Sequence, residues 1–346
     1  MTRLYIALEQ ALAIVDQQNG AWKAEMQLTG HHTQCVAVDP LRPQYVYCGT
    51  FGEGLWRSRD AGASWEPIGE GVIQKQVMSV AVSKTEQRGA ASVVYAGTEP
   101  SAFYRSEDGG TSWQEMERLR QLPSAPTWSF PPRPYTSHIR WITPDPLVEG
   151  RLFVAVEAGA LLRSLDGGEH WEDRKPGGPF DTHTLVMHQL APDRLYSAAG
   201  DGFMHAGNGF VQSDDGGETW YRPDDGLQHH YLWGAAADPA DPATIVVSAA
   251  PGPQQAHDPA HALSALYRRS ASEPWQLLQD GLPAQQGTLA SVIAANEAEA
   301  HVFYAANNQG IFRSTDAGYT WEQLPITWPA TLQASRPQAI VAVAEA

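Results

Sequence analysis

One eight-residue pattern, Ser-x-Asp-x-Gly-x-x-Trp, recurs along this chain and constrains its fold more than any other feature. Five intact copies stand at Ser58–Trp65, Ser106–Trp113, Ser164–Trp171, Ser213–Trp220 and Ser314–Trp321. A shortened copy runs from Ser270 to Trp275, and the segment ending at Trp22 looks like the remnant of another. Successive marker tryptophans are 43 to 58 residues apart. This spacing suits a unit of four short strands, so we expect seven copies of one unit.

The order of elements within a unit is that of an antiparallel meander. In the first clear unit, an apolar strand over 35–38 is followed by the turn residues Asp39 and Pro40, and two further strands follow over 45–50 and 54–58. The motif then reads as a hairpin turn. Its Ser and Asp side chains bond turn amides, its Gly supplies a positive φ, and its Trp packs on the sheet. We therefore interpret the motif as structural.

Radial repetition of such sheets predicts an all-β fold, a seven-bladed β-propeller of four-stranded antiparallel blades. The two ends of the chain support closure of the ring. Residues 3–26 supply three strands without an innermost one, while residues 338–344 form an apolar strand without partners. We expect one blade shared between the N- and C-termini, and a single domain over residues 1–346.

Composition excludes several classes of partner and location. The net charge of −16 should repel nucleic acid and anionic membrane surfaces. No apolar run is long enough to cross a membrane and no secretory signal is evident, so we expect a cytoplasmic protein. Two cysteines, Cys35 and Cys48, are too few for a disulfide framework. They could face each other across a hairpin, but buried free thiols are the preferred interpretation.

The repeats resemble those of the Asp-box, or BNR, propellers, a family that includes sialidases, xyloglucanases, sortilin-type receptor domains and photosystem II assembly factors. The resemblance covers essentially the whole chain and implies the fold rather than an activity. A sialidase-like site is not expected, because no Phe-Arg-Ile-Pro segment occurs and the first arginines are Arg3, Arg42 and Arg57. Xyloglucanase-like enzymes use a cleft between two propellers, and the assembly factors carry a basic patch; this acidic chain shows neither.

Long connections collect on one face of the expected propeller. They are residues 118–137, residues 200–209 and residues 250–265. The first leads into an innermost strand, and the other two join the second strand of a blade to the third. Long loops held by a rigid scaffold commonly carry binding and catalysis. We therefore expect function at this face.

Histidines and carboxylates accumulate at the same face. Six of the 12 histidines come just before an innermost strand: His31, His32, His138, His183, His229 and His230. Four acids follow second strands: Glu9, Glu99, Glu157 and Asp201. Such groups can exchange protons or ligate a metal. The candidate catalytic residues are His138, His183, Glu99, Glu157 and Asp201, and the candidate metal ligands are His32, His138, His183 and His230. Inherited repeat decoration without function is the alternative.

Two functions follow from this reading. The preferred one is an enzyme with an axial pocket lined by His and carboxylate groups, a hydrolase or a lyase that acts on a glycan or small molecule. A divalent metal is an option there, because imidazole and carboxylate both ligate such ions. The aromatic residues near these loops would stack on sugar rings or fill blade interfaces; they are Phe51, Trp128, Tyr135, Trp141, Tyr231 and Trp233. The alternative is a non-catalytic propeller that binds a protein partner.

Overall fold

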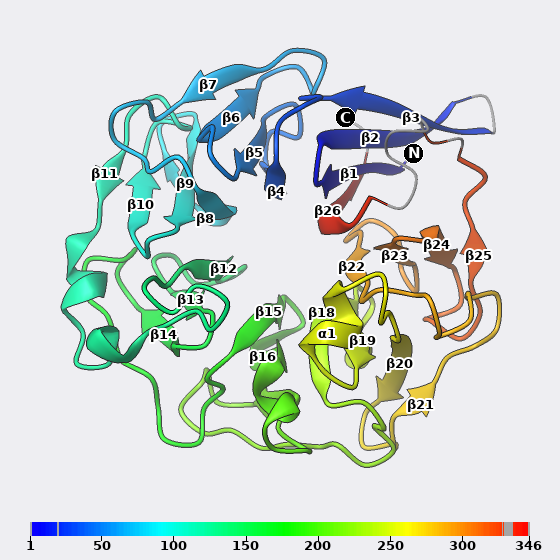
Figure 1. Cartoon of the computed structure of the whole chain (residues 1–346). Helices are drawn as coiled ribbons and strands as arrows, with labels where there is room; N and C mark the ends of the chain where they lie inside the picture. The colour runs from blue at the N-terminus through cyan, green and yellow to red at the C-terminus, as the bar shows by residue number, and fades with distance from the viewer. Residues whose placement is uncertain (1, 19–20, 327, 329–334, 345–346) are drawn as a thin grey trace.

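Seven antiparallel sheets surround a central axis in the computed structural model, which describes residues 2–18, 21–326, 328 and 335–344 (Figure 1). From the inner to the outer strand, the first three blades are β26 (Pro337–Ala344), β1 (Thr2–Leu8), β2 (Ala11–Gln18) and β3 (Ala21–Gln27); β4 (Thr33–Val38), β5 (Val46–Thr50), β6 (Leu55–Ser58) and β7 (Glu66–Ile68); and β8 (Val77–Arg88), β9 (Ala91–Thr98), β10 (Phe103–Ser106) and β11 (Gln114–Glu115).

The remaining blades continue the ring. They are β12 (Ile139–Pro144), β13 (Leu152–Val156) and β14 (Ala160–Ser164); β15 (Thr182–His188), β16 (Ala191–Ala199) and β17 (Phe210–Ser213); β18 (Tyr231–Asp238), β19 (Asp241–Ala250), β20 (Ala265–Ser270) and β21 (Gln276–Leu277); and β22 (Val292–Ala295), β23 (Phe303–Asn307), β24 (Gly310–Ser314) and β25 (Glu322–Gln323). In the two three-stranded blades a single bridge, Arg163 to Glu172 or Gln212 to Tyr221, takes the place of the outermost strand. The predicted seven-bladed, all-β propeller is confirmed.

The shared blade closes the ring as predicted. Strand β26 pairs antiparallel with β1, from Thr2 opposite Ala344 to Leu8 opposite Pro337. It also lies between the innermost strands β22 and β4 of the two neighbouring blades. The two ends of the chain therefore meet in one sheet, and the described termini lie near each other in Figure 1.

The repeated motif forms the same turn five times. In each copy the Ser Oγ accepts the N–H of the motif glycine at 2.7–3.0 Å and donates to the Asp carboxylate at 2.8–3.0 Å. The motif glycines have φ between +88° and +95°, a range that glycine adopts without strain. The turn joins the third strand of a blade to the position of the fourth. The motif is therefore structural, as its residue types predict.

The apolar core lies between the sheets rather than in one central mass. Tyrosines and phenylalanines of the middle strands are fully buried there, among them Tyr47, Phe103 and Phe303. Cys35 and Cys48 are both buried and free, so the alternative of a disulfide between them is wrong. Burial raises the pKa of the Cys35 thiol to about 12.

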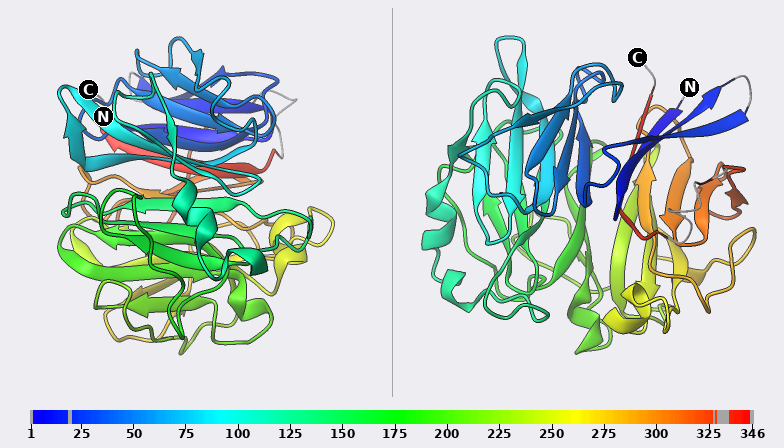
Figure 2. Two further views of the ribbon diagram at one scale, coloured as in Figure 1. Left: turned by 90° about the vertical axis from the view of Figure 1, so that its left-hand side faces the viewer. Right: turned by 45° about the horizontal axis from the view of Figure 1, so that its top comes forward.

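Short helices belong to the connections. They are η1 (Glu117–Gln121), η2 (Ala125–Thr127), η3 (Gly200–Phe203) and α1 (Pro253–His257). In Figure 2, η3 and α1 lie toward the same face of the ring. Among the described residues no helix is long and apolar enough to span a membrane.

Candidate functional site

A cavity of about 750 Å³ opens at the axis, on the face where the innermost strands begin. All three long connections contribute to its wall: Phe130–Arg133 from residues 118–137, Asp201–His205 from residues 200–209, and Pro253 with His257 from residues 250–265. The starts of the strands supply the floor. The cavity therefore lies where the lengths of the loops predict a binding site.

A chain of alternating charges forms one side of the cavity. The Arg133 guanidinium donates two hydrogen bonds of 2.6 Å to Glu99. His138 lies between two carboxylates. Its Nδ1 lies 3.2 Å from Glu99 Oε2, and its Nε2 lies 2.7 Å from Glu157 Oε2. His138 is 1% exposed. Both of its ring nitrogens thus face carboxylates, an arrangement that suits the imidazolium form.

The pKa shifts follow from these contacts. Burial lowers the pKa of His138, but hydrogen bonds to Glu157 and Glu99 outweigh it and the net shift is upward. Burial raises the pKa of Glu99, but hydrogen bonds from His138 and Arg133 bring it down to about 2. For Glu157 burial again acts upward, while the hydrogen bond and charge of His138 hold the pKa well below its usual range. These contacts favour an ionised, charge-paired network.

A second group of three residues adjoins Glu157. His183 Nδ1 lies 2.6 Å from the Leu232 carbonyl oxygen and therefore donates its proton there. Its Nε2 is buried without a hydrogen-bond partner, 3.8 Å from Glu157 Oε1 and 3.7 Å from Asp181 Oδ2. The three ligand atoms lie within 4.8 Å of one another. One imidazole and two carboxylates are a donor set that divalent ions accept.

Asp181 is the member of this group that the solvent reaches. Its side chain is 21% exposed, whereas that of His183 is wholly buried. Burial raises the pKa of Asp181 to about 6. The charge of His183 acts against this rise, and the charge of Glu157 adds to it. Asp201 lies beside it and accepts the backbone N–H groups of Phe180 and Asp181 at 3.0 and 3.1 Å. Burial raises the pKa of Asp201 as well.

Aromatic and cationic side chains lie next to this acidic group. The rings of Tyr231 and Trp233 lie 5.0 and 4.6 Å from the His183 ring, and that of His257 lies 4.4 Å from Trp233. The guanidiniums of Arg140 and Arg336 contact Trp233, with their Cζ atoms 4.4 and 5.2 Å from the ring centroid. The cavity wall therefore combines acidic, aromatic and cationic groups that contact one another.

The sequence-predicted site residues divide into two sets. His138, His183, Glu99, Glu157 and Asp201 all lie in the network at the cavity. Two candidate metal ligands lie outside its wall: His32 Nδ1 contacts Gln10, and His230 Nδ1 accepts the N–H of Gly207. The proposed four-histidine ligand set is thus not gathered at one point among the described residues. The predicted catalytic roles stay predictions.

The remaining candidates have varied surroundings. His31 contacts Glu53 on the surface, and Tyr267 contacts His229. Tyr135 is 85% exposed, whereas Trp128 is buried in the sheet interface. Glu9 is exposed. These side chains therefore lie on the surface or take part in packing. Phe51 is the exception, because the guanidinium of Arg133, a residue of the cavity wall, lies over its ring.

Sequence reasoning missed four charged residues of the site. Asp181 precedes His183 by two positions, so the same strand-start signal could have found it. Arg133 lies in the long connection over residues 118–137. Arg140 and Arg336 lie at the starts of innermost strands, in the same place as the histidines. A search for all ionisable residues at strand starts, rather than for histidine alone, would have included three of the four.

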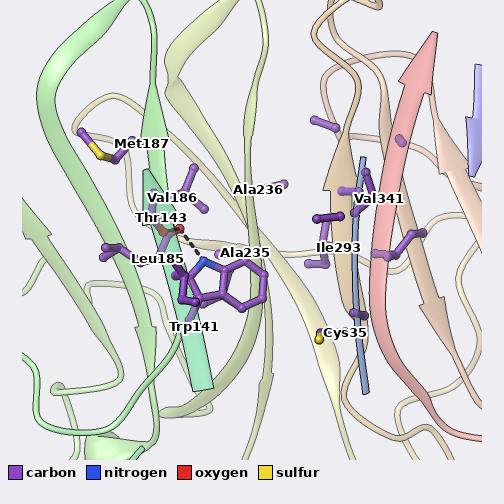
Figure 3. Close-up of a pocket in the computed structure, with 18 of the residues that line it drawn as sticks. Cys35, Trp141, Thr143, Leu185, Val186, Met187, Ala235, Ala236, Ile293 and Val341 are labelled. Atoms are coloured by element: carbon purple, nitrogen blue, oxygen red, sulfur yellow. Dashed lines mark hydrogen bonds between the residues drawn. The ribbon is translucent and has the colours of Figure 1, made fainter. Parts of the chain in front are cut away.

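Below the cavity, the axis continues as a channel of about 430 Å³ between the innermost strands. Figure 3 shows its walls, with Leu185, Ala235 and Ile293 from β15, β18 and β22 turned toward the open space. Trp141 Nε1 donates to the Leu185 carbonyl at 3.1 Å, which holds the indole against the wall. Met78 and Arg140 line both spaces. The walls of both spaces are mainly apolar.

Comparison with known proteins places the fold. No protein-family model and no curated protein matches the chain at a significant level. A GH74 enzyme of Niastella koreensis matches with a TM-score of 0.69 and 16% identity, over 92% of this chain and 52% of that one. The GH74 xyloglucanase of Xanthomonas campestris gives 0.64 and 15%, over 98% and 52%. YCF48 bound to a D1 peptide gives 0.58 and 17%, over 84% and 80%.

These matches are likenesses of fold, because every identity is low. The chain spans about half the length of the GH74 enzymes and most of the length of YCF48. The neighbours include glycoside hydrolases and a peptide-bound protein, so the fold alone serves both kinds of function. Membership of the Asp-box family stays a prediction from the repeats.

Proposed function

We propose that this protein is a hydrolase or lyase whose axial cavity binds a glycan or small molecule. The observation that carries the proposal is the convergence of Glu157, Asp181 and His183 at the wall of an open cavity. Two carboxylates and an imidazole at such distances can donate and accept protons on a bound molecule. Tyr231 and Trp233 contribute aromatic surface to the wall beside these groups.

The role proposed for each residue follows from its exposure to the cavity and from its contacts. Asp181, the more exposed carboxylate, would exchange a proton with the ligand, and Glu157 would supply a fixed negative charge beside it. His183 would act through its bare Nε2. His138 and Glu99 hold Glu157 in place rather than touch the ligand. Asp201 positions Asp181 through the backbone N–H groups it accepts.

A divalent metal is part of one version of this proposal. Glu157, Asp181 and His183 would be its ligands, in place of the four histidines predicted from the sequence. The hydrogen bond from His183 Nδ1 to a backbone carbonyl supports it, because metal-ligating histidines usually donate their other N–H in this way. Metal analysis of untagged protein, with His183→Ala as the comparison, tests this version: a bound divalent ion is expected, and an equal metal content in both proteins would contradict it.

The activity test uses substitutions that keep side-chain size. We expect Asp181→Asn and Glu157→Gln to lower turnover about 100-fold or more, the usual loss when an acid or base is removed. Hydrolysis is followed by release of reducing ends, and elimination by the ultraviolet absorbance of the new C=C bond, over a panel of neutral and acidic glycans. His205→Ala, which removes an exposed side chain at the same cavity, is the control. Full turnover in Asp181→Asn would contradict the proposal.

The second candidate is a non-catalytic platform for a protein partner. Exposed apolar side chains at the rim favour it, since Phe203 and Met204 are 55% and 73% exposed. YCF48, of similar length, is known with a bound peptide. A platform that binds a protein partner does not need an open cavity, so we prefer the enzymatic function. Loss of a co-purifying partner in Met204→Asp, with no turnover in the parent protein, would reverse that preference. A cytoplasmic location stays a prediction.

A further inference from the structure

Two arginines at the cavity lack the partners that buried arginines need. Arg140 is 7% exposed, and its Nε has no hydrogen bond. The Nε of Arg336 is likewise buried without a partner. Among the described residues, the one carboxylate oxygen within 4 Å of either guanidinium is Glu157 Oε2, 3.8 Å from Arg140 Nε, and that oxygen already accepts a hydrogen bond from His138.

Three comparable arginines each keep at least one side-chain hydrogen bond. Arg57 donates two hydrogen bonds to Glu66, and Arg151 donates to Asp145. Arg269 is the closest counterpart of Arg140, because it is 6% exposed and its guanidinium lies over Trp275. Arg269 nevertheless donates to the Gln212 side chain at 2.7 Å. The Nε of Arg269 is also buried without a partner. What sets Arg140 and Arg336 apart is that neither guanidinium donates any hydrogen bond to another described residue, whereas that of Arg269 does.

The two guanidiniums also repel each other. Both contact the Trp233 ring, and burial followed by the charge of the neighbouring arginine lowers the pKa of Arg336. Burial lowers the pKa of Arg140 too. Desolvated like charges are unfavourable unless an anion accompanies them. An anionic group in the cavity would accept their free N–H groups and offset the repulsion.

We propose that Arg140 and Arg336 bind the carboxylate of an organic ligand in the axial cavity. The planar guanidinium matches a carboxylate in shape and donates two parallel hydrogen bonds to it. The ligand class is thus an acidic sugar or another small organic acid. This inference rests on the proposed function in that it takes the cavity as the binding site of the substrate.

The position of the arginines fits that function. Arg140 lies directly beside Glu157, so a carboxylate held there would bring the adjoining carbon atoms of the ligand next to Glu157, Asp181 and His183. Glu157 is itself paired with His138, so the two arginines remain the groups that would hold an anion. They would fix the charged end of the ligand, with the part that reacts beside the neighbouring Glu157 and Asp181.

The test is a binding measurement that needs no turnover. The Nε–H resonances of Arg140 and Arg336, assigned by Arg140→Gln and Arg336→Gln, are followed by NMR while acetate or its neutral analogue acetamide is added. We expect both resonances to shift saturably with acetate, at about ten-fold lower concentration than with acetamide. The Arg269 resonance should not move. Absence of a saturable shift with acetate, or an equal response to acetamide, would overturn the proposal.

The ligand class is tested with glucuronate and galacturonate against glucose and galactose by calorimetry. Preference for the acids should vanish in the Arg140→Gln/Arg336→Gln protein and persist in Arg269→Gln, the matched variant of a buried arginine. Thermal unfolding of each variant shows whether it folds. Binding of sulfate or phosphate in place of any carboxylate would overturn the assignment. Asp181→Asn should keep acid binding, so failure of the catalytic proposal remains distinguishable from failure of this one.

Discussion

At the scale of single residues, the mouth of the propeller is organised by alternating charges. Arg133, Glu99, His138 and Glu157 follow one another, each within 3.2 Å of the next. The chain links a long connection to two strand ends, so it fixes the loop against the blade. Removing one member should cost more than removing a member of an exposed ion pair, because the remaining buried charge is left unpaired.

Acid stability depends on this chain in a predictable direction. The pKa of Glu99 is about 2 in the folded protein against an ordinary 4.5, so its contribution is present above pH 4.5 and is lost as the pH falls toward 2. We expect Glu99→Gln to lower the free energy of unfolding by about 1–2 kcal/mol at pH 7, and by less at pH 3. Urea unfolding at both pH values measures this. The exposed Glu70→Gln serves as control, and a deficit in Glu99→Gln that is the same at both pH values would refute the idea.

At the scale of elements, the turn motif acts by local bonds alone. Each copy joins its Ser, Asp and Gly within five residues, and no distant residue is needed to shape it. This locality explains why the blades could be predicted from the sequence. The Trp that ends the motif packs on the sheet, with Nε1 of Trp65 bonded to the Gly62 carbonyl at 3.0 Å.

The buried serine should matter more than exposed hydroxyls of the same turn. Ser58 is 1% exposed and both accepts and donates a hydrogen bond, so Ser58→Ala leaves the Gly62 N–H without its partner. We expect a loss of about 1–2 kcal/mol of unfolding free energy. Ser64→Ala, which removes an exposed hydroxyl of that turn, should cost less than about 0.5 kcal/mol. Chemical denaturation compares the two, and equal losses would argue against the structural role of the motif.

The site was less predictable than the blades, for a physical reason. Glu157 and His138 were found because strand ends collect at one face in any propeller. The partnership of Arg140 with Arg336 depends on ring closure, which brings the last strand beside the axis, and on the register that turns each side chain inward. The raised pKa of Asp181 comes from its burial beside Glu157. A strand-start pattern can place these residues near the cavity, but it cannot show which of them contact one another, because those contacts join segments that are distant in sequence.

At the scale of the whole molecule, one strand completes the ring. Strand β26 lies against β1 along its length and touches the innermost strands of both neighbouring blades. It also brings Gln338 to the cavity, next to Arg336 at the strand's start. Closure and the site thus share a single segment, and loss of this segment should affect both.

Removal of that strand should open the propeller. A chain that ends at residue 326 leaves the buried face of β1, including Leu4 and Ile6, without its partner. We expect its unfolding temperature to fall by more than about 10 °C, since several kcal/mol of burial are lost. Calorimetry with and without an added peptide of residues 335–346 measures the loss and its rescue. A chain lacking only residues 345–346 is the control; unchanged melting of the longer truncation would contradict the closure.

The apolar channel under the cavity has a kinetic consequence. A charged molecule that left by this route would shed its water against alanine, valine and isoleucine side chains along the axis. Under the proposed function, an anionic ligand would therefore enter and leave through the cavity mouth. A product that kept its charge would have to leave before the next molecule could bind, so accumulated product would compete with the substrate.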